Sequence, residues 1–144
     1  MVKILILFDS GFIYSYINSD NEKHNIALPI MREALRGQYG KLMVSNYVLD
    51  EALTLARART RRCDCGRAIL VFVRTKEEGK AAFYEIIVDR TMIEVAEGYY
   101  EKFCEKGLSF TDCIQLAIIE KHEIQYFATF DRSFIGLAEI LPTT

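Results

Sequence analysis

The sequence predicts an α/β fold in which helices pack against a parallel sheet. Short apolar runs, typical of buried strands, alternate with longer stretches that predict helices, and the connections between them are short. The first run, "VKILILF", has almost no polar interruption, which is the pattern of a strand covered on both faces. With 144 residues, 51% of them hydrophobic and 26% charged, the chain suits a single folded domain over residues 1–144.

The elements follow one another in a regular order. Strands are predicted at 2–8, 41–45, 84–89, 124–129 and 138–142. Helices are predicted at 11–18, 26–36, 46–60, 91–107 and 109–122, with Pro29 expected in the first turn of the second one and Ser45 or Asn46 able to cap the third. The run at 67–75 suits either a buried strand or a short helix, and "CDCG" before it interrupts the pattern.

The cysteine and hydropathy patterns indicate the redox state of the thiols and the cellular location of the protein. Cys63 and Cys65 are too close for an easy mutual disulfide, and with Cys104 and Cys113 they lack the paired spacing of a zinc ribbon, so reduced thiols are expected. Asp9 ends the first apolar run far short of a signal-peptide core or a membrane span. We therefore expect a cytoplasmic protein that does not cross a membrane.

The net charge of −2 hides an uneven distribution. Residues 57–80 carry 8 Lys and Arg against 3 Asp and Glu, whereas residues 81–144 carry 5 against 11. A basic block inside an acidic protein indicates a surface that binds an anionic partner or a solvated helix end.

Four acidic residues, far apart in the sequence, fall just after a predicted strand or in the first turns of a predicted helix. Asp9 follows the first strand and Asp131 follows the strand at 124–129, while Asp112 and Glu51 lie near the starts of two helices. Sites in parallel α/β sheets form at the carboxyl ends of strands. Helical phase places Glu51 at the border of an apolar stripe and Asp50 further toward solvent.

Each of these acids also has a structural interpretation. Asp9 and Asp131 could each cap a helix that follows, and the pair Ser109 and Asp112 has the spacing of a capping box. Glu51 could be a solvated helix acid. If the acids form a site, we expect any capping at the first helix to come from Ser10 rather than Asp9.

With these motifs in place, the chain resembles PIN domains, and most closely the short prokaryotic ones typified by VapC-type toxins. The resemblance covers nearly the whole chain and rests on four pieces in the family's order: "LFDSGFIYSYI", "SNYVLDEAL", "GLSFTDCIQLAI" and "FATFDRSF". It implies a three-layer α/β/α sandwich with a mainly parallel central sheet. It also implies a ribonuclease that depends on Mg²⁺ or Mn²⁺, with Asp9, Glu51, Asp112 and Asp131 as the catalytic, metal-binding acids.

Small hydroxyl residues beside the acids match the family pattern as well, namely Ser10, Thr111, Thr129 and Ser133. One departure is Asp50, which precedes Glu51 where many relatives have a small residue. Carboxylates suit this chemistry because hard oxygen ligands hold divalent cations, and four of them together repel one another without a cation.

This interpretation gives the basic block at residues 57–80 a function in binding. Arginines continue the helix of Glu51 or follow it, and they would contact single-stranded or looped RNA, or a protein partner: Arg57, Arg59, Arg61, Arg62 and Arg67. Arg62 shares the angular position of Glu51 about 16 Å further along the predicted axis.

Partners and rival functions follow from the same resemblance, which implies an antitoxin protein and a homodimer. The leading hypothesis is the toxin of a type II toxin–antitoxin pair. The alternatives are a PIN-type RNA-processing nuclease without an antitoxin and a PIN-like RNA-binding or scaffold subunit without activity.

Overall fold

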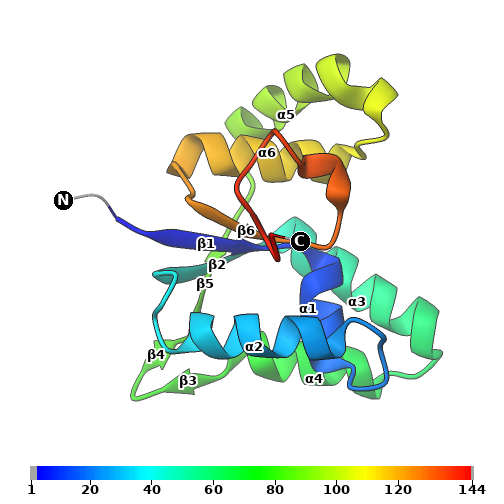
Figure 1. The fold of residues 1–144 in the computed structure, drawn as a ribbon, viewed down its shortest axis with the longest axis vertical. Coiled ribbons are helices and arrows are strands. Elements are labelled where there is room, and N and C mark those ends of the chain that lie inside the picture. The colour runs from blue at the N-terminus through cyan, green and yellow to red at the C-terminus, as the bar shows by residue number, and fades with distance from the viewer. Residues whose placement is uncertain (1–2, 144) are drawn as a thin grey trace.

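The computed structural model describes residues 3–143 and has three layers, with helices on both faces of a central sheet (Figure 1). The five strands of this sheet are all parallel, in the order β5-β2-β1-β6-β7. They are β1 (Leu5–Phe8), β2 (Lys41–Ser45), β5 (Phe83–Ile86), β6 (Tyr126–Ala128) and β7 (Ile140–Leu141). The predicted α/β sandwich around a parallel sheet is confirmed.

Two groups of helices cover the sheet. One face carries α1 (Ser10–Ile17), α2 (His24–Leu35), α3 (Asn46–Thr60) and α4 (Asp64–Arg74). The other face carries α5 (Arg90–Phe103) and α6 (Phe110–His122). Two short 3-10 helices, η1 (Cys104–Lys106) and η2 (Arg132–Phe134), follow α5 and β6, and a small hairpin joins β3 (Lys76–Glu77) to β4 (Lys80–Ala81).

The central strand β1 divides the core into two halves. Ile6 and Phe8 pack in the cluster beneath α1 to α4, whereas Leu5 and Leu7 pack in the cluster beneath α5 and α6. All four side chains are buried, because a parallel strand with helices on both faces exposes neither side. This double coverage places the end of β1, and therefore Asp9, inside the protein.

Several predicted boundaries are confirmed and others move. The strand at 41–45 and the helix at 46–60 are as predicted, and Ser45 caps α3 by accepting a hydrogen bond from the Val48 N–H at 3.0 Å. The predicted start of the first strand at residue 2 lies outside the described residues. Helix α2 begins two residues earlier than predicted, so Pro29 is not in its first turn.

The ambiguous run at 67–75 belongs to a helix. Helix α4 begins at Asp64, so "CDCG" opens this helix instead of only interrupting the chain. Ile69 and Val73 are buried at helical spacing, while Val71 between them is 66% exposed. That pattern is amphipathic, which a run of apolar letters does not reveal by itself. The hairpin of β3 and β4 was not predicted.

Gly40 provides a test of how β1 and β2 meet. Its φ is +82°, and a Cβ atom added there would lie 2.0 Å from the carbonyl oxygen of Ile4. Gly37, at φ +89°, has open space around the same position. We expect Gly37→Ala to lose about 1–2 kcal/mol from left-handed strain alone, and Gly40→Ala to lose clearly more, because backbone atoms must also move apart. Equilibrium urea unfolding of the two variants measures the difference, and equal losses would contradict this packing.

Candidate active site

The four predicted acids gather at the carboxyl edge of the sheet. Asp9 directly follows β1, and the neighbours of β1 in the sheet are β2 on one side and β6 on the other. Glu51 lies on α3, which follows β2, and Asp131 comes shortly after β6. The chain leaves β1 toward β2, while β6 pairs with the opposite side of β1. Such a switch point is where parallel sheets form their sites.

Asp9 is the most enclosed of the four acids, with only 8% of the residue exposed. Its Oδ1 accepts a hydrogen bond from the Ser10 N–H at 3.0 Å, and its Oδ2 accepts one from the Thr129 hydroxyl at 2.7 Å. The Thr129 hydroxyl in turn accepts from the Asp131 N–H at 3.0 Å. One buried hydroxyl therefore links the ends of β1 and β6.

Asp9 is also the N-cap residue of α1. The expectation that Ser10 would take the capping role was wrong. The Ser10 hydroxyl instead donates to Glu51 Oε1 across a gap of 41 residues, at 2.5 Å. Because the main-chain N–H of Ser10 binds Asp9 and its side chain binds Glu51, this serine connects two of the acids. Asp50 is exposed, which agrees with the preference for Glu51 from helical phase.

The two remaining acids take part in helix capping. Asp112 and Ser109 form the predicted capping box at the start of α6, in which Asp112 Oδ2 accepts from the Ser109 N–H at 2.9 Å. Asp131 caps η2, and its Oδ1 accepts from the Ser133 N–H at 2.9 Å. The structural interpretations of Asp9, Asp112 and Asp131 thus hold in the structure. Capping is not the only notable property of these side chains, because the pKa values of Asp9 and Asp112 are also raised.

Burial and neighbouring carboxylates disfavour negative charge on Asp9 and Asp112. Burial, with the nearby charges of Asp112 and Glu51, raises the pKa of Asp9 from 3.8 to about 7, against the lowering effect of its hydrogen bonds. Burial raises the pKa of Asp112 as well, with further contributions from the charges of Asp131 and Glu51. The four acids therefore act on one another electrostatically, although they come from four separate parts of the chain.

The described part of the chain offers these acids no basic partner. Its five salt bridges involve Arg36, Arg62, Arg74, Arg90 and Lys121, and none includes any of the four acids. A cluster of hard oxygen donors with uncompensated charge fits a divalent cation such as Mg²⁺ or Mn²⁺.

The carboxylates do not yet converge on one point. Among residues 3–143, no three acidic, histidine or cysteine side chains are arranged as a metal-binding group. Each acid is turned toward its own hydrogen-bond donor. Within the described residues, however, one oxygen of each of Glu51, Asp112 and Asp131 accepts no hydrogen bond.

The four small hydroxyl residues have different surroundings. Ser10 and Thr129 bind acids through their side chains, as described above. Ser133 contributes its main-chain N–H to Asp131, and Thr111 lies beside Asp112 on α6.

Gln115 was missed by the sequence analysis. It is fully buried on α6, and its side-chain amide donates to the carbonyl of Phe8, the residue before Asp9, at 3.4 Å. A glutamine inside an otherwise apolar helix was the available signal.

The arginines do not form one track along α3. The helix ends at Thr60, and Arg61 has left-handed backbone geometry with a φ of 59°. Arg62 pairs with Asp64 at 2.6 Å beyond the helix end. The expectation that Arg62 continues the angular position of Glu51 along one axis was therefore wrong, while Arg57 and Arg59 do lie on α3.

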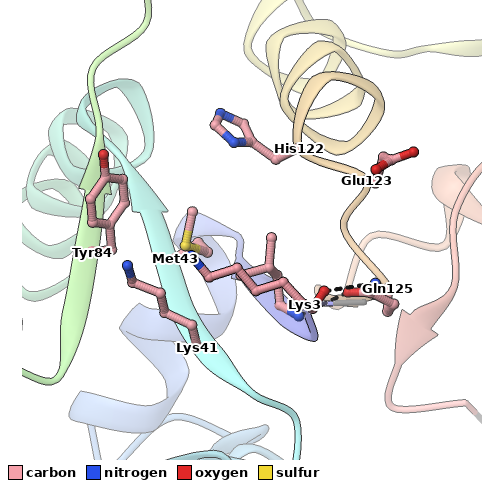
Figure 2. A pocket seen from close by; sticks show the side chains of 8 residues that line it. Lys3, Lys41, Met43, Tyr84, His122, Glu123 and Gln125 are labelled. Carbon is pink, nitrogen blue, oxygen red and sulfur yellow. Dashed lines mark hydrogen bonds between the residues drawn. The ribbon is translucent and has the colours of Figure 1, made fainter. Parts of the chain in front are cut away.

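A crevice of about 790 Å³ lies at the opposite edge of the sheet, near the starts of β1 and β2 (Figure 2). Lys3, Lys41, Tyr84 and His122 are among its lining residues, and Gln125 joins Lys3 and Leu5 by hydrogen bonds of 3.0 and 2.8 Å. None of the four acids lines it. This crevice is therefore separate from the acidic site.

Two further features bear on the expectations from the sequence. The four cysteines are free thiols, with Cys113 buried and Cys63 and Cys104 exposed. Within the described residues, no helix has both the length and the apolar character needed to cross a membrane.

Comparison with known proteins identifies the family. The PIN domain family matches residues 6–140, so this chain belongs to it. A VapC ribonuclease of Archaeoglobus fulgidus is 27% identical over 139 residues, which cover 90% of this chain and 81% of that protein. The predicted membership of the PIN family is confirmed.

Solved structures show the same fold. VapC20 of Mycobacterium tuberculosis, described as a toxin that cleaves the sarcin–ricin loop, matches with a TM-score of 0.75 and 22% identity over 92% of this chain and 94% of its own. VapBC2 from Rickettsia felis, bound to a DNA fragment from its promoter, matches with a TM-score of 0.66 and 12% identity over 95% and 97% of the two chains. These likenesses confirm the three-layer fold.

The raised pKa of Asp9 predicts that the metal-free protein loses stability as the pH rises. Between pH 3.8 and about 7, the folded protein keeps a proton on Asp9 that the unfolded chain releases, so the free energy of unfolding falls with pH. The stabilisation is complete below pH 3.8 and lost above about pH 7. It amounts to at most about 4 kcal/mol. Urea unfolding in EDTA from about pH 5.5 to about pH 8 measures this dependence.

Asp9→Asn is the control for this measurement, because it removes the titrating group. The difference in unfolding free energy between wild type and variant should change with pH, and a constant difference would contradict the raised pKa. Added Mg²⁺ or Mn²⁺ should raise the melting temperature of the wild type more at about pH 8 than at about pH 5.5, since cations bind ionised carboxylates.

Proposed function

We propose that residues 1–144 form a single PIN domain that acts as a metal-dependent endoribonuclease in the cytoplasm. The observation that carries this proposal is the gathering of Asp9, Glu51, Asp112 and Asp131 at one edge of the sheet, where burial and the neighbouring carboxylates disfavour negative charge on Asp9 and Asp112. The likeness to the VapC ribonuclease of Archaeoglobus fulgidus supports ribonuclease activity. Retention of all four acids argues against a scaffold subunit without activity.

Mg²⁺ or Mn²⁺ is the proposed cofactor, with all four acids as candidate ligands. Asp9 and Asp131 are the first candidates for direct contact, because both follow adjacent parallel strands. Glu51 and Asp112 would complete or orient the ligand set. When bound, such a cation lowers the pKa of the attacking water and offsets the negative charge that develops on the phosphoryl group.

The protein's own groups prepare this site. Thr129 orients one oxygen of Asp9 and holds the backbone at Asp131, and Ser10 orients Glu51. Burial of Asp9 keeps competing water away from its carboxylate. The caps at Asp112 and Asp131 position each carboxylate while leaving one oxygen for a cation. Thr111 and Ser133 are proposed to lie in the supporting shell.

We further propose that the protein is the toxin of a type II toxin–antitoxin pair and forms a homodimer. Structural neighbours support the antitoxin, since they include VapBC2 from Rickettsia felis and a toxin–antitoxin complex from Klebsiella pneumoniae. RNA, single-stranded or in a loop, is the proposed substrate. Arg57, Arg59, Arg61, Arg62 and Arg67 are all exposed and remain the proposed contacts to RNA or to the antitoxin.

Asp9→Asn should lower cleavage of single-stranded RNA by roughly a hundredfold or more, because it removes a ligand charge. The fold should survive, since a neutral side chain of this shape resembles the protonated Asp9 of the metal-free protein. Chelation of divalent ions should have the same effect on the wild type, reversed by Mg²⁺ or Mn²⁺. Gel-resolved cleavage of a labelled RNA and circular dichroism of the variant measure both expectations.

Asp50→Asn is the matched control, because Asp50 is exposed and adjacent in sequence to Glu51. Its cleavage rate should stay within about threefold of the wild type. Undiminished cleavage by Asp9→Asn would overturn the proposed acidic site.

Expression in a bacterial host separates the toxin from its alternatives. The wild type should arrest growth, Asp9→Asn should not, and co-expression of the product of the adjacent gene should relieve the arrest. Arrest that no adjacent gene product relieves favours an RNA-processing nuclease without an antitoxin. Purified protein that binds RNA but never cleaves it, with Mg²⁺ or Mn²⁺ present, would favour the scaffold alternative.

A further inference from the structure

A small cavity of about 250 Å³ adjoins the acidic site on the side of α1 and α3. Three residues of its lining are close in sequence to residues of the acidic site, which places the cavity there. Gly11 in its lining follows Ser10, Leu55 lies one turn beyond Glu51, and Phe130 stands between Thr129 and Asp131. The loop between α1 and α2 closes the remaining side with Asn21, Glu22 and Lys23. A ligand in this cavity would therefore lie next to the carboxylates.

Two cations line this cavity, Lys23 and Arg59. Neither takes part in a salt bridge within the described residues. The Lys23 Nζ atom lies 5.1 Å from the ring centroid of Phe130, a cation–π distance. Phe130 is itself stacked on the buried Phe12, with ring centroids 5.1 Å apart and an angle of 18° between the planes. An anchored aromatic ring therefore holds the Lys23 ammonium group over the cavity.

Arg59 differs from the other arginines of the basic block in where it lies. It lines this cavity together with Leu55, four residues before it on the same helix. Arg57 and Arg61 line a separate hollow with Leu53 on another side of α3. Arg62 is paired with Asp64. Among the five arginines of the block, only Arg59 lines the cavity beside the acids.

We propose that this cavity, the Lys23–Arg59 pocket, binds the ribose–phosphate unit next to the phosphate that is cleaved. The inference rests on the proposed nuclease function and specifies where the RNA strand lies. Acids that hold a divalent cation repel the other phosphates of the strand, so a neighbouring phosphate needs cations of its own. Lys23 and Arg59 supply them, and Glu22 is the one acid in the lining. The small volume suits one nucleotide of a single strand.

RNA binding by charge variants tests this inference, with Asp9→Asn as the background so that the RNA stays intact. Lys23→Met and Arg59→Gln should each raise the dissociation constant for a labelled single-stranded RNA by roughly fivefold, measured by fluorescence anisotropy. Each should also reduce the slope of log affinity against log salt by about 0.7, the value for one lost phosphate contact on a single strand. Lys23→Arg keeps the charge and should bind nearly as the parent does.

Arg32→Gln is the matched control, because it removes one exposed positive charge from α2, outside the pocket and outside the proposed RNA contacts. Its dissociation constant should change by less than about twofold. Equal effects of Arg32→Gln and Arg59→Gln would overturn the pocket while leaving the nuclease proposal standing, provided that the wild type cleaves RNA. A wild type that neither binds nor cleaves RNA would overturn both proposals. Loss of antitoxin binding alone in Lys23→Met and Arg59→Gln would also overturn the pocket.

Discussion

The unfavourable burial of Asp9, beside other carboxylates at one edge of the sheet, is the electrostatic cost that the surrounding strands and helices must offset. Asp9 stands at the end of a strand covered on both faces, so solvent cannot screen its charge, and its pKa rises to about 7. A flexible loop would relieve such strain by turning the acids outward. Here β1, β6 and two packed helices hold them, and in the proposed metal site a bound cation would offset the cost in stability.

The hydrogen bonds around these acids are compatible with both a folding role and the proposed chemical role of the same side chain. Asp112 closes a capping box with one oxygen, and Asp131 caps a 3-10 helix in the same way. Each carboxylate oxygen has two lone pairs, and capping uses only part of this capacity. A cap also fixes the rotation of the carboxylate, which reduces the entropy lost when a cation binds. Structural and catalytic interpretations of these residues are therefore compatible.

Local signals in the sequence were sufficient for much of this architecture. Strand β2 and helix α3 were predicted to the residue, because a buried run meets the capping residue Ser45. Other features depend on tertiary packing. The run within α4 reads equally as strand or helix until Ile69 and Val73 are seen to face the core. Helix α3 ends at Arg61, which has left-handed backbone geometry, and no glycine in the sequence marks this end. That ending separates Arg62 from the direction of Glu51.

The difference between local sequence signals and tertiary packing also explains why the positions of the acids were predictable and the adjoining pocket was not. An acid at the end of a strand has a position set by the sheet, whereas Lys23 belongs to a loop whose path only the folded chain defines. The two sites are nevertheless joined electrostatically. An RNA strand cannot approach four uncompensated carboxylates, so a cation at the acids strengthens RNA binding in the pocket. By thermodynamic linkage, RNA held by Lys23 and Arg59 must strengthen cation binding by the same factor. Under the proposed function, metal and RNA therefore bind cooperatively, and the repulsion between the acids and the RNA phosphates is the source of that coupling.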